Sequence, residues 1–170
     1  MSQYICVDIG GTSIKHGVLD ENAIIKECNQ TKTEAWLGGA AVLDKVKTIG
    51  KQYKEQYENI EGICISTAGM VDPEEGKIVF AGELMPDYTG TCIKKELEKA
   101  LEMPCEVEND VNCAGLAEYV SGSAKESHIM FCATVGTGIG GCAIVNGRVF
   151  HGASNSACEV GYIPMGDSDF

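Results

Sequence analysis

A glycine-rich run that leads directly into a β-hairpin is the feature that most constrains this fold. Residues 135–141 read VGTGIGG and contain the spacing G-x-G-x-x-G. A dinucleotide-binding fold needs a helix immediately after these glycines, so that the helix N-terminus meets the pyrophosphate. Here the next residues are CAIVNGRVF, and Asn146-Gly147 between apolar residues is typical of a two-residue hairpin. The run therefore predicts a phosphate-cradling turn between two strands. Its candidate binding residues are Gly136, Thr137, Gly138 and Gly140.

A second glycine turn lies near the N-terminus, where residues 8–12 read DIGGT between two apolar runs. Paired glycines let a backbone approach a ligand closely, and the amides of such a turn form an anion site. Asp8 is a candidate to hold a hydrated Mg²⁺ ion, which takes one or two carboxylates beside phosphate oxygens. Thr12 is placed to donate its hydroxyl to a phosphate. The alternative is a plain hairpin turn with no ligand. The candidate binding residues are Asp8, Gly10, Gly11 and Thr12.

The order of the expected elements predicts an α/β layer fold with a mixed sheet. Apolar spacing indicates strands over 4–9, 14–19, 22–30, 62–67 and 105–109, and helices over 37–57, 91–101 and 111–120. A second sheet starts near residue 128, without the helices needed to cover it. We therefore expect an N-terminal domain over 1–120 and the start of a second, incomplete domain over 121–170.

Three further segments contain candidate site residues beside a glycine or at a helix start. Asp110 lies near a predicted helix N-terminus, where the anion is favoured, so it is a candidate general base, and Asn109 suits sugar hydroxyls. Glu159 is the only ionised group between residues 152 and 166, and Gly69 follows a strand end. A helix cap, a surface charge and a plain strand-to-turn junction are the respective alternatives.

Composition excludes several classes of function. The formal net charge is −12 and the chain has a single arginine, so a nucleic-acid binder is not expected. No span is apolar enough to cross a membrane, and no signal peptide is visible. The nine cysteines show neither disulfide-framework nor zinc-ligand spacing, which predicts buried thiols and a cytoplasmic location. The three histidines have no triad partner and are expected to be structural.

The order of these motifs resembles the ROK family of repressors, open reading frames and kinases. DIGGT, AGMVD, ENDVNCAGLAE, VGTGIGG and EVGY follow one another from Tyr4 to about Pro164. The resemblance implies the actin-like (ribonuclease H-like) ATPase fold and phosphorylation of a hexose or N-acetylhexosamine, at the 6-hydroxyl, by ATP with Mg²⁺. It implies Asp110 as the general base, with Asn109, Gly69 and Glu159 contacting the sugar. A homodimer is one assembly that the resemblance leaves open.

Two departures from the family pattern bear on these expectations. The family usually has a histidine three residues after the Glu159 equivalent, but this chain has Tyr162, a poor zinc ligand that can still hydrogen-bond a sugar. The family's cysteine-rich zinc loop and adenosine-binding segment would lie beyond Phe170, so zinc is not expected. The alternatives to a kinase are a non-catalytic sugar-binding regulator and a truncated, inactive member.

Overall fold

The computed structural model describes residues 1–136 and 138–163. The chain divides into two compact units, one ending at Asp110 and the other beginning at Val111. This division falls at the first turn of a helix. The predicted domain boundary at residue 120 lies near the end of the same helix and stays a prediction.

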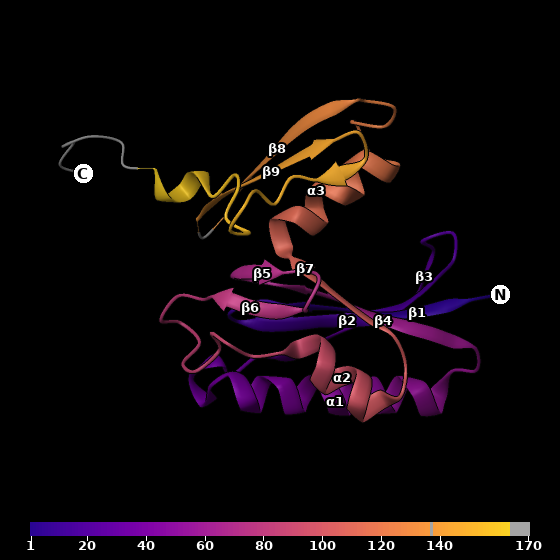
Figure 1. Cartoon of the computed structure of the whole chain (residues 1–170). Helices are drawn as coiled ribbons and strands as arrows, with labels where there is room; N and C mark the ends of the chain where they lie inside the picture. Colours follow the sequence, from indigo (N-terminus) through magenta and orange to yellow (C-terminus); the bar gives the residue numbers. More distant parts are fainter. Residues whose placement is uncertain (137, 164–170) are drawn as a thin grey trace. The chain divides into compact units, whose positions relative to one another are not determined.

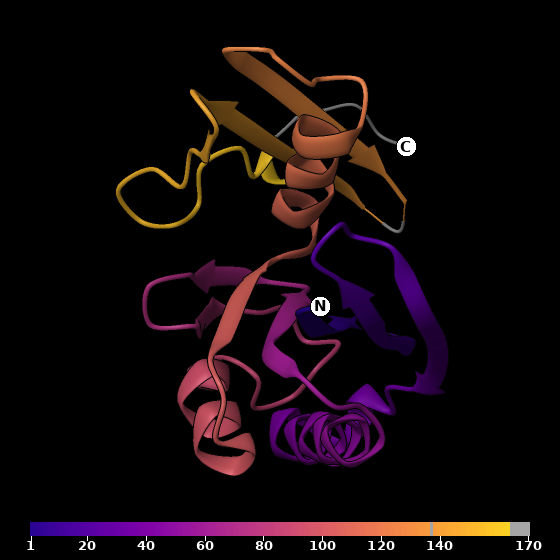
Figure 2. The ribbon, with the colours of Figure 1, turned by 90° about the vertical axis from the view of Figure 1, so that its right-hand side faces the viewer.

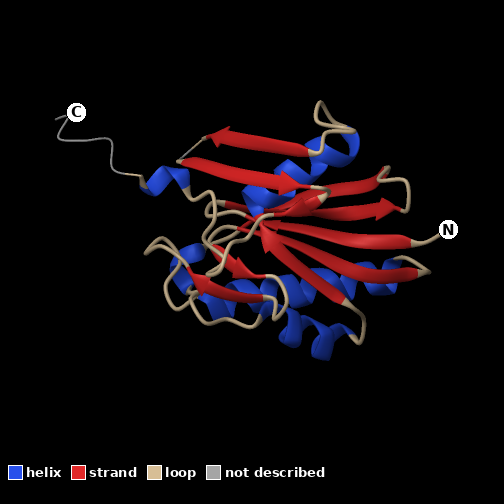
Figure 3. Cartoon of the chain, turned by 45° about the horizontal axis from the view of Figure 1, so that its top comes forward, coloured by secondary structure: helices blue, strands red, loops and turns tan. Residues whose placement is uncertain are grey.

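The first unit is built on a five-stranded mixed sheet with strand order β3-β2-β1-β4-β7 (Figures 1 and 3). Three strands are antiparallel neighbours: β1 (Gln3–Ile9), β2 (Ser13–Asp20) and β3 (Ile25–Lys32). Two more, β4 (Ile60–Thr67) and β7 (Cys105–Asn109), extend the sheet parallel to β1. The predicted mixed sheet is confirmed, including the three sequential antiparallel strands at its start.

Two helices cover one face of this sheet, α1 (Gly39–Gln56) and α2 (Ile93–Leu101) (Figure 1). Alternate strand residues point toward them and are buried, as the period of a strand requires. The core they share includes Ile5, Val7, Ile9, Ile63, Ile65, Val107, Val42, Val46 and Leu97. Each such side chain contributes about 1.5–3 kcal/mol when it is fully buried.

The first helix begins two residues later than the apolar spacing predicts. A short 3-10 helix, η1 (Ala35–Leu37), precedes it, and Gly38 between the two has a φ of +87°. Gly39 donates its amide to the carbonyl oxygen of Pro86 at 2.8 Å. A Cβ on Gly39 would lie 2.8 Å from the Asp87 carbonyl oxygen, so the following loop packs directly on the helix start. This tertiary contact sets the boundary.

A small hairpin of β5 (Met70–Asp72) and β6 (Lys77–Phe80) follows β4, and the sequence pattern did not predict it. Its turn is closed by Asp72, whose Oδ1 accepts the amides of Glu74 at 3.0 Å and Glu75 at 3.1 Å. Gly76 supplies a φ of +57° there. The carboxylate of Asp72 is therefore used within the turn.

The second unit pairs helix α3 (Asp110–Ser121) with a three-stranded antiparallel sheet in the order β10-β9-β8 (Figure 2). The strands are β8 (Ile129–Val135), β9 (Ile139–Val145) and β10 (Arg148–Val149), and a 3-10 helix, η2 (Val160–Tyr162), follows. Asn146 and Gly147 have φ values of +49° and +80°, which confirms the predicted hairpin turn. The glycine run therefore joins two strands and no helix follows it.

The cysteines correct one prediction from the sequence. Only Cys105 and Cys142 are buried, whereas Cys28 and Cys64 are exposed and the other five are half-buried. The reason is the period of two along β1 and β4: Cys64 falls on the face of the sheet away from α1 and α2. The apolar run around Cys64 is typical of a strand buried on both faces, and this pattern led to the prediction of a buried thiol.

Candidate active site

The carboxyl ends of three parallel strands bring the predicted residues of the first unit to one edge of its sheet. Ile9 of β1 pairs with Thr67 of β4, which pairs with Asn109 of β7, so the three strands end level. Ligands of open α/β sheets bind outside such carboxyl ends. The residues gathered there by strand ends and the turns after them are Asp8, Gly10, Gly11, Thr12, Gly69, Asn109 and Asp110.

The glycine turn after β1 is braced by Thr33. The Gly10 amide donates to the carbonyl oxygen of Ser13 at 3.1 Å, which closes the turn. Thr33, fully buried, donates its hydroxyl to the Gly10 carbonyl at 2.6 Å and its amide to the Thr12 carbonyl at 3.1 Å. A Cβ on Gly10 would lie 3.0 Å from the Ser13 oxygen, but one on Gly11 would meet no atom within 4 Å. The Gly11 side of the turn therefore has open space for a ligand.

Sequence reasoning missed Thr33, because no motif marks the segment TKTEAW. The only signal is the register of β2 with β3, in which Ser13 pairs with Lys32 and brings the next residue beside the glycine turn. That register depends on a tertiary pairing, so the residue pattern alone does not predict it.

Asp8 lies half-buried on β1, opposite Ser66 on β4. The Ser66 hydroxyl donates to Asp8 Oδ1 at 2.8 Å and so orients the carboxylate. One oriented carboxylate beside an open glycine turn fits the coordination of Mg²⁺, which takes its remaining ligands from phosphate and water. Across residues 1–136 and 138–163, no group of three or more His, Cys, Asp or Glu side chains is arranged to hold a metal ion.

Asn109 links the turn after β4 to the first residue of α3. Its Nδ2 donates to the Gly69 carbonyl oxygen at 2.9 Å and to Asp110 Oδ1 at 3.0 Å. Gly69 has a φ of +99°, and a Cβ there would lie 2.7 Å from the carbonyl oxygen of Phe80, so the position requires glycine. Asp110 is exposed in the first turn of α3, where the helix dipole stabilises an anion. The amide of Asn109 thus orients the carboxylate proposed as the base.

A buried hydrogen bond lies next to this edge and has no counterpart in the sequence reasoning. The Thr67 hydroxyl and the Tyr88 hydroxyl lie 2.7 Å apart, and both side chains are buried. Burial raises the pKa of the Tyr88 phenol to about 12, so it stays protonated. The pair fixes the loop of Tyr88 against the end of β4, immediately before the turn that contains Gly69.

The second glycine turn lies between β8 and β9 of the second unit. Gly136 donates its amide to the Gly138 carbonyl at 2.9 Å, and a Cβ on either glycine would meet no atom within 4 Å. Thr137 lies outside the described residues. Gly140 has a packing role, since a Cβ there would lie 2.4 Å from Cγ2 of Val111. The turn is therefore open on one side, like the turn at Gly11, and is packed against α3 on the other.

Glu159 and Tyr162 flank η2, which packs on the glycine-rich strand β9. A Cβ on Gly161 would lie 2.2 Å from the Ile139 carbonyl oxygen, and one on Gly141 would lie 2.5 Å from that of Cys158. Glu159 is half-buried at the N-terminal end of η2, and Tyr162 is exposed. These glycine contacts hold the backbone of η2 against β9, next to the second glycine turn and within one unit.

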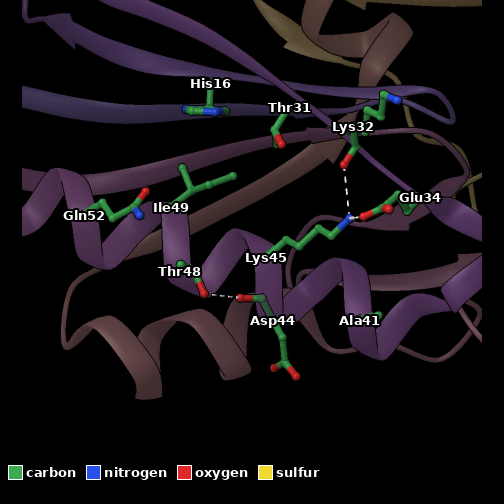
Figure 4. A pocket seen from close by; sticks show the side chains of 10 residues that line it. All are labelled: His16, Thr31, Lys32, Glu34, Ala41, Asp44, Lys45, Thr48, Ile49 and Gln52. Carbon is green, nitrogen blue, oxygen red and sulfur yellow. Dashed lines mark hydrogen bonds and ion pairs between the residues drawn. The ribbon is translucent and has the colours of Figure 1, made fainter.

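The cavity drawn in Figure 4 is separate from all these residues. It has a volume of about 730 Å³, opens between α1 and strands β2 and β3, and is lined by His16, Lys45 and Glu34 among others. His16 lies 2.9 Å from the Tyr53 hydroxyl, and burial lowers the pKa of its imidazole. Lys45 donates to the Thr33 carbonyl at 2.9 Å and also pairs with Glu34. Lys45 and Glu34 are thus paired within the cavity wall, and Lys45 stabilises the segment of Thr33 that contacts Gly10.

The order of the two glycine turns, the Asn109–Asp110 pair and Glu159 along the chain is matched as a whole by one family. The sequence pattern of the ROK family matches residues 4–169. The chain belongs to the ROK family. Within the described residues of this ROK protein, no helix is long and apolar enough to cross a membrane.

Several curated relatives of this chain are sugar kinases. The chain is 32% identical over 165 residues to a glucokinase of Streptomyces coelicolor, covering 97% of this chain and 50% of that protein. It is 33% identical over 156 residues to a β-glucoside kinase of Listeria monocytogenes, covering 92% and 51%. An uncharacterized protein of Clostridium perfringens is 53% identical over 163 residues, covering 96% and 55%. The chain therefore spans about half the length of the curated relatives it matches.

Solved structures confirm the fold class, for the N-terminal half of those proteins. A ROK family glucokinase from Streptomyces griseus, in complex with glucose and AMPPNP, matches with a TM-score of 0.84 at 30% identity, covering 96% of this chain and 51% of that one. A putative sugar kinase from Cytophaga hutchinsonii matches with a TM-score of 0.85 at 26% identity, covering 95% and 54%. The mixed α/β fold is thus the actin-like ATPase fold of ROK sugar kinases.

Proposed function

We propose that this protein transfers a phosphoryl group from ATP to a sugar hydroxyl, the 6-hydroxyl of a hexose or N-acetylhexosamine, with Asp110 as general base. One observation carries the proposal: in a chain related to glucokinases and a β-glucoside kinase, parallel strand ends bring Asp8, Gly69 and Asp110 to one edge of the sheet. In this proposal a substrate at that edge meets the Asp8 carboxylate, the open turn at Gly11 and the Asp110 carboxylate.

Asp110 accepts the proton of the attacking hydroxyl in this proposal. Asp110 lies in the first turn of α3, where the helix dipole favours an anion, and the hydrogen bond from the Asn109 amide at 3.0 Å orients the carboxylate. Phosphoryl transfer has a loose transition state, so positioning of the hydroxyl contributes more than basicity does. Asn109 is also the proposed contact for a second sugar hydroxyl, through its side-chain oxygen as the acceptor, because its Nδ2 donates to Gly69 and Asp110.

Each glycine turn is proposed, within its own unit, to bind phosphate oxygens of a nucleotide. Bound ATP with Mg²⁺ supplies the transferred phosphoryl group and neutralises charge on its oxygens. Asp8, oriented by Ser66, is placed to bind the cation. A Cβ on Gly11 in the first unit, or on Gly138 in the second, would meet no atom within 4 Å, so the backbone there is open to a ligand. Thr12 offers its hydroxyl as a donor. Thr137 and the packing residue Gly140 complete the second turn in the proposal.

Glu159 and Tyr162 are proposed as the sugar contacts of the second unit. A carboxylate accepts hydrogen bonds from two vicinal hydroxyls, and a phenol donates or accepts one. The close packing of η2 on β9 keeps both near the second glycine turn. A cytoplasmic location, a small-molecule sugar as a partner without nucleic acid or membrane, and the homodimer that the resemblance leaves open remain predictions from the sequence.

A regulatory, sugar-sensing protein or an inactive member is the competing function. The observation in its favour is that a ROK family transcriptional regulator shares the fold with a TM-score of 0.82, at 20% identity. Such a protein would bind sugar without consuming ATP.

A phosphorylation assay over a panel of sugars separates the two. We expect ATP-dependent formation of a sugar phosphate from at least one hexose, N-acetylhexosamine or β-glucoside, measured by coupled ADP release and product mass. Sugar binding by calorimetry without any phosphoryl transfer across the panel would favour the sensor and count against the kinase. Because the chain spans about half the length of its curated relatives, the same panel is run on the chain extended by the C-terminal half of a relative.

A further inference from the structure

Two cysteines lie side by side on adjacent strands of the first unit, and neither belongs to the candidate site described above. Cys6 of β1 and Cys64 of β4 are register partners, so their side chains project from the same face of the sheet. That face is the one opposite α1 and α2, because the residues flanking them, among them Ile5 and Ile63, are buried beneath those helices. Neighbouring strands lie about 4.8 Å apart, within the range of Cα separations of about 4.4–6.8 Å that a disulfide bridges.

The two thiols differ in accessibility in a way that suits stepwise oxidation. Cys64 is exposed, whereas Cys6 is half-buried beside it. A hydrogen bond from the Cys6 thiol lowers the pKa of Cys64 to about 7. It outweighs partial desolvation of the thiol and the nearby Glu106 carboxylate, which both raise that pKa. Glu106 is the register partner of Cys64 on β7, and its charge is paired with Lys94 at 3.1 Å. An exposed, partly ionised thiol with a second thiol in contact is the arrangement of a redox-sensitive pair.

We infer that Cys64 and Cys6 form a redox site at which a peroxide oxidises Cys64 and Cys6 closes a reversible disulfide. The Cys64 thiolate attacks one oxygen of hydrogen peroxide, the O–O bond breaks, and hydroxide leaves to give a sulfenic acid at Cys64. The Cys6 sulfur then attacks the Cys64 sulfur, the S–O bond breaks, and the Cys6 proton leaves with that hydroxyl as water. The hydroxide from the first step takes up the proton that Cys64 lost. Two thiols and one peroxide thus yield one disulfide and two waters.

The site borders the edge described above without being part of it. Asp8 and Ser66, joined at 2.8 Å, are the next residues on the same face of the same two strands. A disulfide between Cys6 and Cys64 would fix the two strands together one residue pair before that hydrogen bond. The inference itself does not depend on the proposed kinase function, because its test follows the thiols.

Tryptic peptides make the test unambiguous. Cleavage after lysine places Cys6 alone in residues 1–15, Cys64 alone in 55–77 and Cys28 alone in 27–32. The intact chain is treated with hydrogen peroxide at neutral pH and low protein concentration, blocked with iodoacetamide and digested for mass spectrometry. We expect peptides 1–15 and 55–77 joined with the loss of two hydrogens, and separated again by dithiothreitol.

Variants identify the roles of the two thiols. Cys6→Ser keeps a hydroxyl donor beside Cys64 but cannot form the disulfide, so the linked peptide should be lost completely and a dimedone-reactive sulfenic acid should appear in peptide 55–77. Cys28→Ser is the matched control, since Cys28 is an exposed cysteine on β3 of the same sheet, and it should leave the linked peptide unchanged. Circular dichroism confirms that each variant is folded. If wild type gives no 1–15/55–77 link, or if Cys64 links to Cys28 as readily as to Cys6, the inference is overturned.

Discussion

Gly69→Ala should destabilise the first unit strongly, because the backbone at this position tolerates no side chain. The φ of +99° lies outside the regions that alanine favours, which costs about 1–3 kcal/mol. The added Cβ would also lie 2.7 Å from the Phe80 carbonyl oxygen, a backbone atom that cannot move alone, and overpacking of this kind costs about 1–3 kcal/mol. Together these effects give a loss of about 2–6 kcal/mol in the free energy of unfolding.

Gly82→Ala is the matched control in the loop after β6. A Cβ on Gly82 would meet no atom within 4 Å, and its φ is not in the left-handed region, so alanine there should be neutral within about 0.5 kcal/mol or slightly stabilising. Urea denaturation is followed by circular dichroism and by the fluorescence of Trp36, the only tryptophan, which lies in the first unit. Equal unfolding free energies for Gly69→Ala and Gly82→Ala would refute the backbone argument, and with it the requirement for glycine beside Asn109.

Two further substitutions test the hydrogen bond that stabilises the candidate edge and, elsewhere in the first unit, the pH dependence of the free energy of unfolding. Thr33→Val removes the buried hydroxyl that donates to the half-buried Gly10 carbonyl and should lower the free energy of unfolding by about 1–3 kcal/mol in urea denaturation. Thr48→Val removes an exposed helical hydroxyl and should cost almost nothing; equal losses would contradict the stabilising role of Thr33. Asp20 accepts a hydrogen bond from Lys26, and this bond holds the pKa of its carboxyl below the usual value. A lowered folded-state pKa stabilises the protein above the usual pKa of about 3.9, and the stabilisation is lost as the pH falls through the folded-state value. Wild type should therefore be more stable than Asp20→Asn at pH values near neutral, with the difference in urea midpoint disappearing in acid; a difference that is constant with pH would argue against the ionised pair.

The strands and glycine turns could be predicted from the sequence because their signals are local. Alternation of apolar residues sets β1, β2 and β4, and the Asn146-Gly147 pair sets the β9–β10 turn through backbone preference alone. The absence of a helix after the second glycine turn follows from the same local reasoning. These predictions are confirmed.

The features that the sequence did not reveal depend on contacts between distant segments. Thr33 reaches the Gly10 carbonyl only because β2 and β3 pair in a particular register. The exposure of Cys64 follows from which face of the sheet the helices cover, and an apolar run does not indicate that. The family resemblance makes Gly140 a candidate phosphate contact, and the sequence does not show that its lack of a side chain also serves packing against Val111. The roles assigned to the site residues remain predictions.

Substitution of Asp110 tests the central claim most directly. Asp110→Asn keeps the size of the side chain and its place at the start of α3, but it removes the carboxylate that would take the hydroxyl proton. We measure kcat for sugar phosphorylation and, separately, the sugar dissociation constant by calorimetry. The account predicts a loss in kcat of about 10²–10⁴-fold with sugar binding changed little, the usual contribution of a general base. A variant that phosphorylates sugar at the wild-type rate would contradict the assignment of Asp110.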